Sequence, residues 1–550
     1  MLRLVAQATM MNEATAPLAP LTPNPSPQRG EGSRIPNVAT LLFVLFCGLN
    51  YFSPLADLDW SWQVRTGEQI VRTRSLRVAD EFTYTIADNP LQDFEWLYEV
   101  LLYGTWSAFG MGGLKLLRVL FVAAPLWILA QRLRREKFAW HGIALTLLLC
   151  FVVLAQAWNL RPMLVTTIGL LLVSGWLHDH CTGGKLLDWK LPLLMLIWAN
   201  GHPGVIAGQG MLAAAIGWEW FNRFAKWNTP LERDRFWRLA AFAGLGLAAS
   251  FICPDPIERL RYTFKPELAH PIHREFVEML PLWTSLRTQP MVVIPVYLVA
   301  FAVLTTIILR PRTWRVWELV VLGALGVLGN FATRSMPDWY LVMLSLGLPH
   351  IRTLWLSAIA TNARRTWVRR LLSLDNIAKR LFASRIFRWQ PRWAIGILGM
   401  LFAVSALPYP GRTMPIADAP QWPTGAMDFA AKQQLAGNYF APPDYGAYVG
   451  WRLKDAGKAY VDTRGFFFPP KLLEDSIYLP RMHDDWRERL DRVFAHETDY
   501  FLLETTGSRG RMWEMLRPYL NQPLYVDEQS ALLTAADVKQ AAERLAHASR

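Results

Sequence analysis

Acidic side chains gather between residues 53 and 95, and their types and spacing suit chemistry on a sugar. Asp57 and Asp59 stand two positions apart, and Asp80 and Glu95 follow in the same segment. Two carboxylates at this spacing can bind one divalent cation such as Mg²⁺ or Mn²⁺, so Asp57 and Asp59 are candidate metal ligands. A carboxylate can also act as general base toward a sugar hydroxyl. Asp57, Asp59 and Asp80 are therefore candidate catalytic groups.

Aromatic residues alternate with these acids, among them Trp60, Trp62 and Tyr84. Aromatic faces beside carboxylates suit carbohydrate binding, so we place Trp60 and Glu95 in a candidate substrate-binding surface. An acidic outer loop with Trp anchors at the membrane interface explains the same residues as well. Spacing alone leaves both interpretations open.

Three more candidate substrate-binding residues, Arg161, His202 and Arg334, stand at the ends of apolar runs. Arginine forms bidentate hydrogen bonds to phosphate oxygens, so either arginine can hold a phosphate group. For each arginine alone, snorkelling to the membrane interface is the alternative. His202 can act as a general base, a metal ligand or a phosphate partner, and a structural histidine that closes a turn is the alternative.

The elements that must position these residues are membrane spans. Of the 550 residues, 52% are hydrophobic, and they fall in runs of roughly 15–22 residues, the length that crosses a bilayer core. Many runs are apolar on all sides, unlike the amphipathic helices of soluble proteins. We predict an α-helical polytopic membrane protein with about eleven spans. The predicted spans are Asn37–Phe52, Leu114–Leu133, Phe138–Ala157, Met163–Leu177, Leu186–Asn200, Val205–Phe221, Leu239–Cys253, Met291–Leu309, Val316–Phe331, Trp339–Ile351 and Trp393–Leu407.

Loop charges orient these spans. Basic residues outnumber acidic ones in Gln131–Lys137, Asn222–Arg238, Arg310–Arg315 and Leu354–Gln390, and such loops belong in the cytoplasm. Eleven crossings from a cytoplasmic N-terminus place all four loops inside. The acidic segment 53–95 and the C-terminal domain then lie outside. We expect Leu354–Gln390 to contact anionic lipid headgroups.

The chain divides into a disordered N-terminus (1–36), a transmembrane domain (37–410) and a soluble external α/β domain (411–550), where short helical and strand patterns alternate. The net charge of +13 does not indicate nucleic-acid binding. The last domain holds 17 basic and 19 acidic residues, so the whole excess lies between the apolar runs. The four cysteines form no CxxC pair, so no zinc site is indicated.

Taken together, the motifs resemble those of bacterial membrane proteins related to the GT-C glycosyltransferases, whose members are largely uncharacterised. The resemblance spans almost the whole chain after residue 37, and the combination is more specific than any one motif. The motifs that carry it are Asp57-Leu58-Asp59-Trp60, Thr66-Gly67, Asp80-Glu81-Phe82-Thr83-Tyr84, Glu95-Trp96-Leu97-Tyr98-Glu99-Val100, Arg161-Pro162, Trp198-Ala199-Asn200-Gly201-His202-Pro203-Gly204, Arg334, Asp444-Tyr445-Gly446-Ala447-Tyr448 and Val461-Asp462-Thr463-Arg464.

The resemblance implies a transferase that moves a sugar from a polyprenyl-phosphate-linked donor to a glycan, lipid or protein acceptor on the outer face of a bacterial inner membrane. In such enzymes an aspartate of the first external loop lies at the catalytic centre, sometimes with a divalent metal. Asp57 is the first choice for that position, with Asp59 beside it. Arg161 and Arg334 would hold the donor's phosphate. The chain departs from the pattern at Met279, where relatives tend to carry Trp after a glutamate, here Glu278.

Two other functions fit a membrane protein of this composition. One is a transporter, or a scaffold for envelope polysaccharide assembly, without enzymatic activity. The other is a GT-C fold that has lost catalysis and only binds glycan. Transporters tend to carry charges within spans and to contain internal inverted repeats. The sequence shows few charges within its predicted spans and no evident repeat. We therefore rank glycosyl transfer first.

Overall fold

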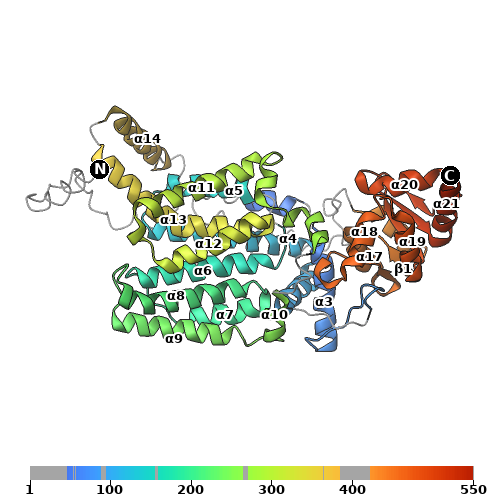
Figure 1. Ribbon diagram of the computed structural model, residues 1–550, viewed down its shortest axis with the longest axis horizontal. Helices are drawn as coiled ribbons and strands as arrows, with labels where there is room; N and C mark the ends of the chain where they lie inside the picture. The colour runs from blue at the N-terminus through green and yellow to red at the C-terminus, as the bar shows by residue number, and fades with distance from the viewer. Residues whose placement is uncertain are drawn as a thin grey trace, which may run out of the picture.

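The computed structural model describes residues 46–53, 55, 57–87, 94–154, 159–263, 270–362, 365–383 and 422–548. These residues form a helical bundle with a sheet-containing domain at one end (Figure 1). The expected disordered N-terminus, the expected domain boundary near residue 411 and the predicted span Trp393–Leu407 lie outside the described residues.

The bundle consists of apolar helices whose large side chains point both into the core and outward. On α11, for example, Leu298, Phe301 and Ile308 are 62, 70 and 68% exposed, as expected for a helix that faces lipid. The helices are α4 (Trp96–Arg135), α5 (Trp140–Leu154), α6 (Met163–Cys181), α7 (Lys190–Gly201), α8 (Val205–Ala225), α9 (Arg233–Ala249), α11 (Pro290–Leu309), α12 (Val316–Phe331) and α13 (Met336–Thr361).

Three segments of the described chain are long and apolar enough to cross a membrane: Trp96–Arg135, Pro290–Leu309 and Thr333–Thr361. The shorter helices Trp140–Leu154 and Val316–Phe331 are also apolar. These helices are consistent with an integral membrane protein. The number of eleven spans stays a prediction.

The chain reverses direction between α7 and α8. Trp198 of α7 packs against Gly208 of α8 and against Gly169 of α6, and neither glycine has room for a side chain. Residues 198 and 208 lie on opposite sides of the 201–204 turn, so their contact indicates a helical hairpin. The hairpin fixes His202 at the end of the bundle, between two helices.

Buried and partly buried charged groups lie at the end of the bundle that contains the C-terminal ends of α4 and α6 and the start of α12. Each is paired, which is the condition for keeping a charge inside a protein. The sequence alone gave no sign that these residues meet. The pairs are Arg132 with Asp179 (3.0 Å), Arg315 with Glu219 (2.8 Å) and His178 with Glu318 (2.6 Å).

The segment predicted as an external loop contains a helix, α3 (Asp59–Thr73). This helix lies directly against the start of α4, because Gly67 has no side chain and its Cα comes close to the carbonyl of Glu99. A methyl group at residue 67 would collide with that carbonyl. The close approach brings Asp59 and Glu99 to the same side of the molecule.

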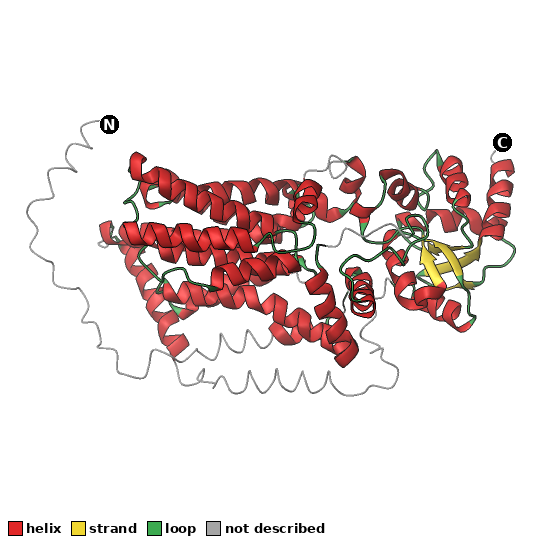
Figure 2. Ribbon diagram, turned by 90° about the horizontal axis from the view of Figure 1, so that it is seen from below, coloured by secondary structure: helices red, strands yellow, loops and turns green. Residues whose placement is uncertain are grey.

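The C-terminal domain is a five-stranded sheet with strand order β2-β1-β3-β5-β4 and helices around it (Figure 2). β1 pairs in parallel with β2 and β3, whereas β5 pairs antiparallel with β3 and β4. The strands are β1 (Gly437–Phe440), β2 (Gly457–Ala459), β3 (Tyr500–Glu504), β4 (Tyr525–Val526) and β5 (Ser530–Thr534). The helices are α16 (Thr424–Lys432), α17 (Pro443–Leu453), α18 (Pro470–Tyr478), α19 (Trp486–Ala495), α20 (Arg511–Leu516) and α21 (Ala535–Ala548).

The segment of residues 57–87 extends this sheet at its β2 edge. Thr83 forms a parallel bridge with Ala459, and the Ala459 amide donates to the carbonyl of Phe82 at 3.0 Å. Beside the bridge, Arg464 donates to Asp80 (2.8 Å) and to Asp462 (2.6 Å), and all three side chains are buried. Breaking such a buried pair leaves an uncompensated charge, so the cluster locks the two segments together.

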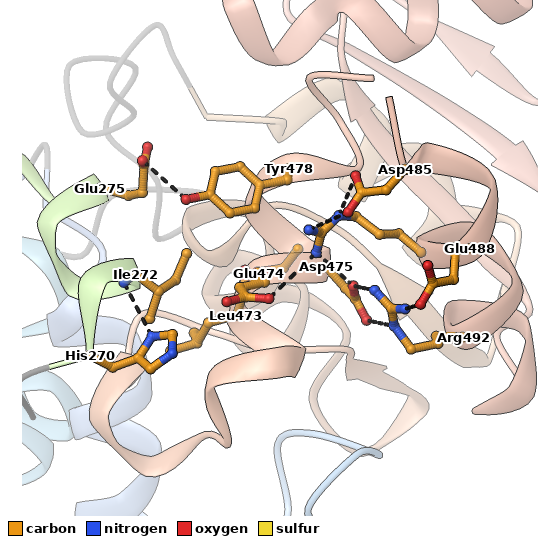
Figure 3. Close-up of polar contacts among 12 residues, drawn as sticks. His270, Ile272, Glu275, Leu473, Glu474, Asp475, Tyr478, Asp485, Glu488 and Arg492 are labelled. Carbon is orange, nitrogen blue, oxygen red and sulfur yellow. Dashed lines mark hydrogen bonds and ion pairs between the residues drawn. The ribbon is translucent and has the colours of Figure 1, made fainter. Parts of the chain in front are cut away.

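A second segment of the membrane domain also holds the C-terminal domain (Figure 3). In the short 3₁₀ helix η3 (Pro271–Glu275), the Glu275 carboxylate accepts hydrogen bonds from Tyr478 (3.2 Å) and Arg481 (2.6 Å). Ile272 is buried in the core of that domain. The next turn, η4 (Val277–Met279), is therefore held beside the domain.

We predict that Asp80→Asn lowers the free energy of unfolding by about 3 kcal/mol, because Arg464 loses one of two buried carboxylates. The measurement is thermal unfolding of the purified protein in detergent. Asp428→Asn is the matched control, since the Asp428–Arg452 pair is partly exposed and is worth about 1 kcal/mol or less. Loss of activity at unchanged stability would instead give Asp80 a chemical role.

Candidate active site

A cavity of about 590 Å³ lies where the bundle, α3 and the C-terminal domain meet. Each of these three parts contributes side chains to its wall, so the cavity exists only in the assembled chain. Its charged, polar and aromatic lining residues are Asp59, Trp62, Gln63, Thr66, Phe94, Glu95, Glu99, Arg161, His202, Tyr262, Glu278, Arg334, Thr463, Arg464 and Phe467.

Arg161, just before α6, joins three carboxylates. Its Nε contacts Asp57 and lies 3.2 Å from Oδ2 of Asp59, and its Nη1 donates to Glu278. Burial alone would lower the pKa of Arg161, but the three carboxylates raise it well above its ordinary value. The guanidinium therefore stays charged and holds together acids from two distant segments. We call these four residues the Arg161 cluster.

The two aspartates of the cluster differ in position. Asp59 lines the cavity, whereas Asp57 is not among the described lining residues and accepts a hydrogen bond from the Asp59 amide at 3.0 Å. Burial and the negative charge of Asp57 raise the pKa of Asp59 to about 7, although Arg161 opposes the shift. Asp59 is thus close to half-ionised at neutral pH, the condition that favours a general base.

Arg334 brings a second positive charge to the same wall. It lies in η7 (Thr333–Ser335), and its Nη1 is 3.7 Å from Glu278. The Thr333 amide donates to the carbonyl of Leu280 at 3.0 Å, which fixes this turn against the segment that carries Glu278. Burial raises the pKa of Glu278, but Arg161 and Arg334 outweigh it, so the net shift is downward and Glu278 is ionised.

His202 is a neutral donor in this arrangement. Its Nδ1 accepts from the Gly204 amide (3.0 Å) and lies 2.7 Å from the hydroxyl of Thr166, so the proton is on Nε2. Nε2 points to Glu95 at 3.5 Å. Burial and Arg334 lower the pKa of His202 to about 3. With Nδ1 already occupied, the role that fits His202 is that of an N–H donor into the cavity.

The cavity wall thus includes five of the sequence-predicted residues, and Asp57 lies directly behind it. Those five are Asp59, Glu95, Arg161, His202 and Arg334.

Two predicted residues lie elsewhere. Asp80 is buried in its ion pair with Arg464 and does not belong to the described lining of the cavity. Trp60 is 1% exposed and packs against Trp106, Trp422 and Trp451. Both join α3 and its flank to neighbouring elements, so in this structure they position the site.

The structure adds residues that the sequence did not assign to the site, among them Glu99, Glu278 and Arg464. Glu278 is followed by Met279 where the resembling proteins tend to carry Trp, so the sequence gave only a weak signal for a role of Glu278 in the site. Arg464 forms a salt bridge with Asp462, two positions before it. Its second partner, Asp80, is 384 residues away, a contact that no local pattern encodes.

A divalent metal bound at the Arg161 cluster would take the carboxylates of Asp57, Asp59 and Glu278 as ligands. Carboxylate oxygens are the ligands that Mg²⁺ and Mn²⁺ prefer. Here, however, the oxygens of Asp57, Asp59 and Glu278 converge on the guanidinium of Arg161. The described part of the chain contains no group of three or more Asp, Glu, His or Cys side chains placed to hold a metal ion. In this arrangement the residues do not fit a metal site.

Comparison with solved structures identifies the fold. The oligosaccharyltransferase of Archaeoglobus fulgidus in its apo form aligns with a TM-score of 0.53 and 11% identity over 87% of this chain and 70% of that one. The same enzyme tethered to an acceptor peptide containing the NVT sequon aligns with a TM-score of 0.51, at the same identity and coverage. No family model and no curated protein matches the sequence. The chain therefore has an oligosaccharyltransferase-like fold, in agreement with the expected GT-C-like architecture.

We predict that Arg161→Gln turns the cluster into a metal site, because the three carboxylates then lose the cation they share and only Arg334, 3.7 Å from Glu278, stays beside them. Mn²⁺ should raise the melting temperature of this variant by a few degrees and that of the wild type by less. The control is Arg452→Gln, which removes a partly exposed arginine from its pair with Asp428, away from the cavity. A wild-type protein that Mn²⁺ stabilises as strongly as the variant would show that metal displaces Arg161.

Proposed function

We propose that the protein is a membrane glycosyltransferase. It moves a sugar from a polyprenyl-phosphate-linked donor to a glycan, lipid or protein acceptor on the outer face of a bacterial-type inner membrane. The main support is the Arg161 cluster at the wall of a cavity that also contains Arg334 and neutral His202. The cavity therefore offers an ionisable carboxylate and phosphate-binding groups together. The oligosaccharyltransferase-like fold supports the same class of reaction.

In the proposed reaction, the acceptor's nucleophilic oxygen or nitrogen attacks the anomeric carbon of the donor sugar. The bond between that carbon and the phosphate oxygen breaks, and polyprenyl phosphate leaves. Asp59 takes the acceptor's proton, as its position on the wall and its pKa of about 7 allow. Arg334 and the Nε2–H of His202 stabilise the charge on the departing phosphate.

Asp57 and Arg161 have supporting roles in this proposal. Arg161 is surrounded by carboxylates, so it positions them rather than binding the phosphate itself. Asp57 fixes Asp59 through the backbone and through Arg161. A metal held by Asp57 and Asp59 stays a prediction from the sequence, and no step of the proposed reaction passes through it.

We expect Asp59→Asn to lower the rate of transfer by roughly 10²–10⁴, the usual contribution of a general base. The assay supplies a polyprenyl-phosphate sugar and a panel of acceptors to the purified protein in lipid, and measures glycosylated product. Asp428→Asn serves as the surface control. Unchanged transfer by a folded Asp59→Asn protein would refute the assignment, and no transfer by the wild type to any acceptor would favour the transporter or scaffold function.

We also expect the rate of transfer to fall as the pH drops through about 7 and to level off above it. Asp59 must be ionised to accept a proton, and below its pKa the ionised fraction decreases about tenfold per pH unit. Because the pKa of His202 is about 3, His202→Asn should leave the midpoint of the profile in place. A flat rate between pH 5 and 8 would contradict the role of Asp59.

A further inference from the structure

Thr166 of α6 lies beside His202 and joins two other segments of the bundle. Its hydroxyl is 2.7 Å from Nδ1 of His202, in the turn between α7 and α8. The indole Nε1 of Trp198, on α7, donates to the same hydroxyl at 2.9 Å. The side chains of Thr166 and Trp198 are buried, whereas His202 lines the cavity and its side chain is 14% exposed. We call Trp198 and Thr166 the His202 support.

The direction of each hydrogen bond in this contact follows from the groups that can only donate. The Trp198 indole is a donor only, so the oxygen of Thr166 accepts from it. The Gly204 amide donates to Nδ1 of His202 at 3.0 Å, so Nδ1 carries no proton. Thr166 must therefore give its own hydroxyl hydrogen to Nδ1.

The same two donors decide which way the His202 ring faces. Turning the ring over would put a C–H group in place of Nδ1, and both the Gly204 amide and the Thr166 hydroxyl would then lose their acceptor. One of these donors is a backbone N–H, which the chain itself fixes in direction. Nε2 therefore keeps the hydrogen and stays on the side of the ring that faces Glu95, which also lines the cavity.

Three glycines make room for this arrangement. A methyl group at Gly204 would lie 2.3 Å from the hydroxyl oxygen of Thr166, although the backbone there has a φ of −60°, which any residue can adopt. Gly169 and Gly208 lie against the ring of Trp198, and methyl groups there would come within 2.4 and 2.5 Å of it. Close packing of the helical hairpin against α6 therefore holds the His202 support in place.

The contacts of Thr166 differ from those of other threonines in the helices. A helix threonine can donate to the carbonyl four residues earlier, as Thr146 does in α5 and Thr305 does in α11. Such a bond stays within one helix. The hydroxyl of Thr166 instead links a donor on α7 to an acceptor in the turn that follows it. These are the contacts of a residue that orients another side chain.

We propose that Thr166 is a positioning residue, which holds His202 as an Nε2–H donor toward the cavity. The proposal deepens the proposed function and rests on it for the acceptor of this hydrogen bond, the phosphate of the departing lipid. The His202 support is in place before any substrate binds, so the donor needs no reorganisation when negative charge develops on the phosphate. A ring free to turn, or to move its proton to Nδ1, would lose part of this stabilisation.

The test removes the Thr166 hydroxyl and observes the ring nitrogens of His202. The full-length protein, labelled with ¹⁵N at histidine only, is studied in lipid nanodiscs by solid-state NMR. The His202 signals are those that disappear in His202→Asn. We expect an unprotonated Nδ1 and a protonated Nε2 in the wild type. In Thr166→Val the Nδ1 signal should shift toward that of a nitrogen with fewer hydrogen bonds, and Thr166→Ser should restore it.

Thr306→Val is the matched control. Trp314 donates to Thr306 at 3.2 Å, and both side chains are buried outside the described lining of the cavity. The control variant therefore also leaves a buried indole N–H without its acceptor, but it should not move the His202 signals. Gly204→Ala disturbs the same contact by a second route, because its methyl group displaces the Thr166 hydroxyl, and it keeps the test decisive if Thr166→Val does not fold.

Transfer from a polyprenyl-phosphate sugar is measured with the same variants. Loss of one hydrogen bond to the donor should lower kcat roughly tenfold in Thr166→Val. The KM for the acceptor should stay unchanged, because His202 acts on the departing phosphate rather than on the acceptor. Thr166→Ser and Thr306→Val should transfer sugar at nearly the wild-type rate.

The proposal is overturned if Nδ1 of His202 carries the proton in the wild type, or if a folded Thr166→Val leaves the Nδ1 signal in place. It is also overturned if Thr306→Val moves that signal equally, or if Thr166→Val transfers sugar at the wild-type rate. Failure of the proposed function looks different. In that case the wild type would transfer no sugar, while the Nδ1 signal would still respond to Thr166→Val, so Thr166 would position His202 for another ligand.

Discussion

The placement of three carboxylates around one guanidinium is the constraint on which the rest of the site depends. Asp57, Asp59 and Glu278 would repel one another without Arg161, and they come from segments about 200 positions apart in the chain. The shared cation lets them approach, while burial and the negative charge of Asp57 raise the pKa of Asp59 against the opposing effect of Arg161. Arg161 therefore sets the geometry of the site and limits the rise in the pKa of Asp59.

A second constraint is that no single domain contains the cavity. The segment of residues 57–87 contributes α3 and one edge bridge to the terminal sheet, and η3 binds the C-terminal domain through Glu275. The membrane bundle supplies Arg161, His202 and Arg334 at helix ends. The architecture resembles that of an oligosaccharyltransferase in overall fold, with 11% identity, so the likeness lies in how the elements are arranged rather than in shared residues.

The sequence predicted those features that follow from local pattern. The apolar run Val316–Phe331 is helix α12 with the same bounds, because length and polarity alone define such a helix. The strands β1 and β5 were missed, since four or five residues without alternation give no periodic signal. Asp80 and Asp59 look alike in sequence. Asp80 differs from Asp59 because it is buried against Arg464, away from the cavity. Tertiary folding, not local sequence, brings Arg464 to it.

The pairing of Asp80 with Arg464 has a consequence for biosynthesis. The two residues are separated by 384 positions, and every helix from α4 to α14 (Thr366–Ala383) is made between them. A ribosome adding residues at about 5–20 per second needs tens of seconds to cover that interval. Throughout it, Asp80 lacks its ion-pair partner, the sheet edge lacks its bridge and the cavity lacks one wall. The cavity is therefore complete only after the last domain of the chain has been made and has folded.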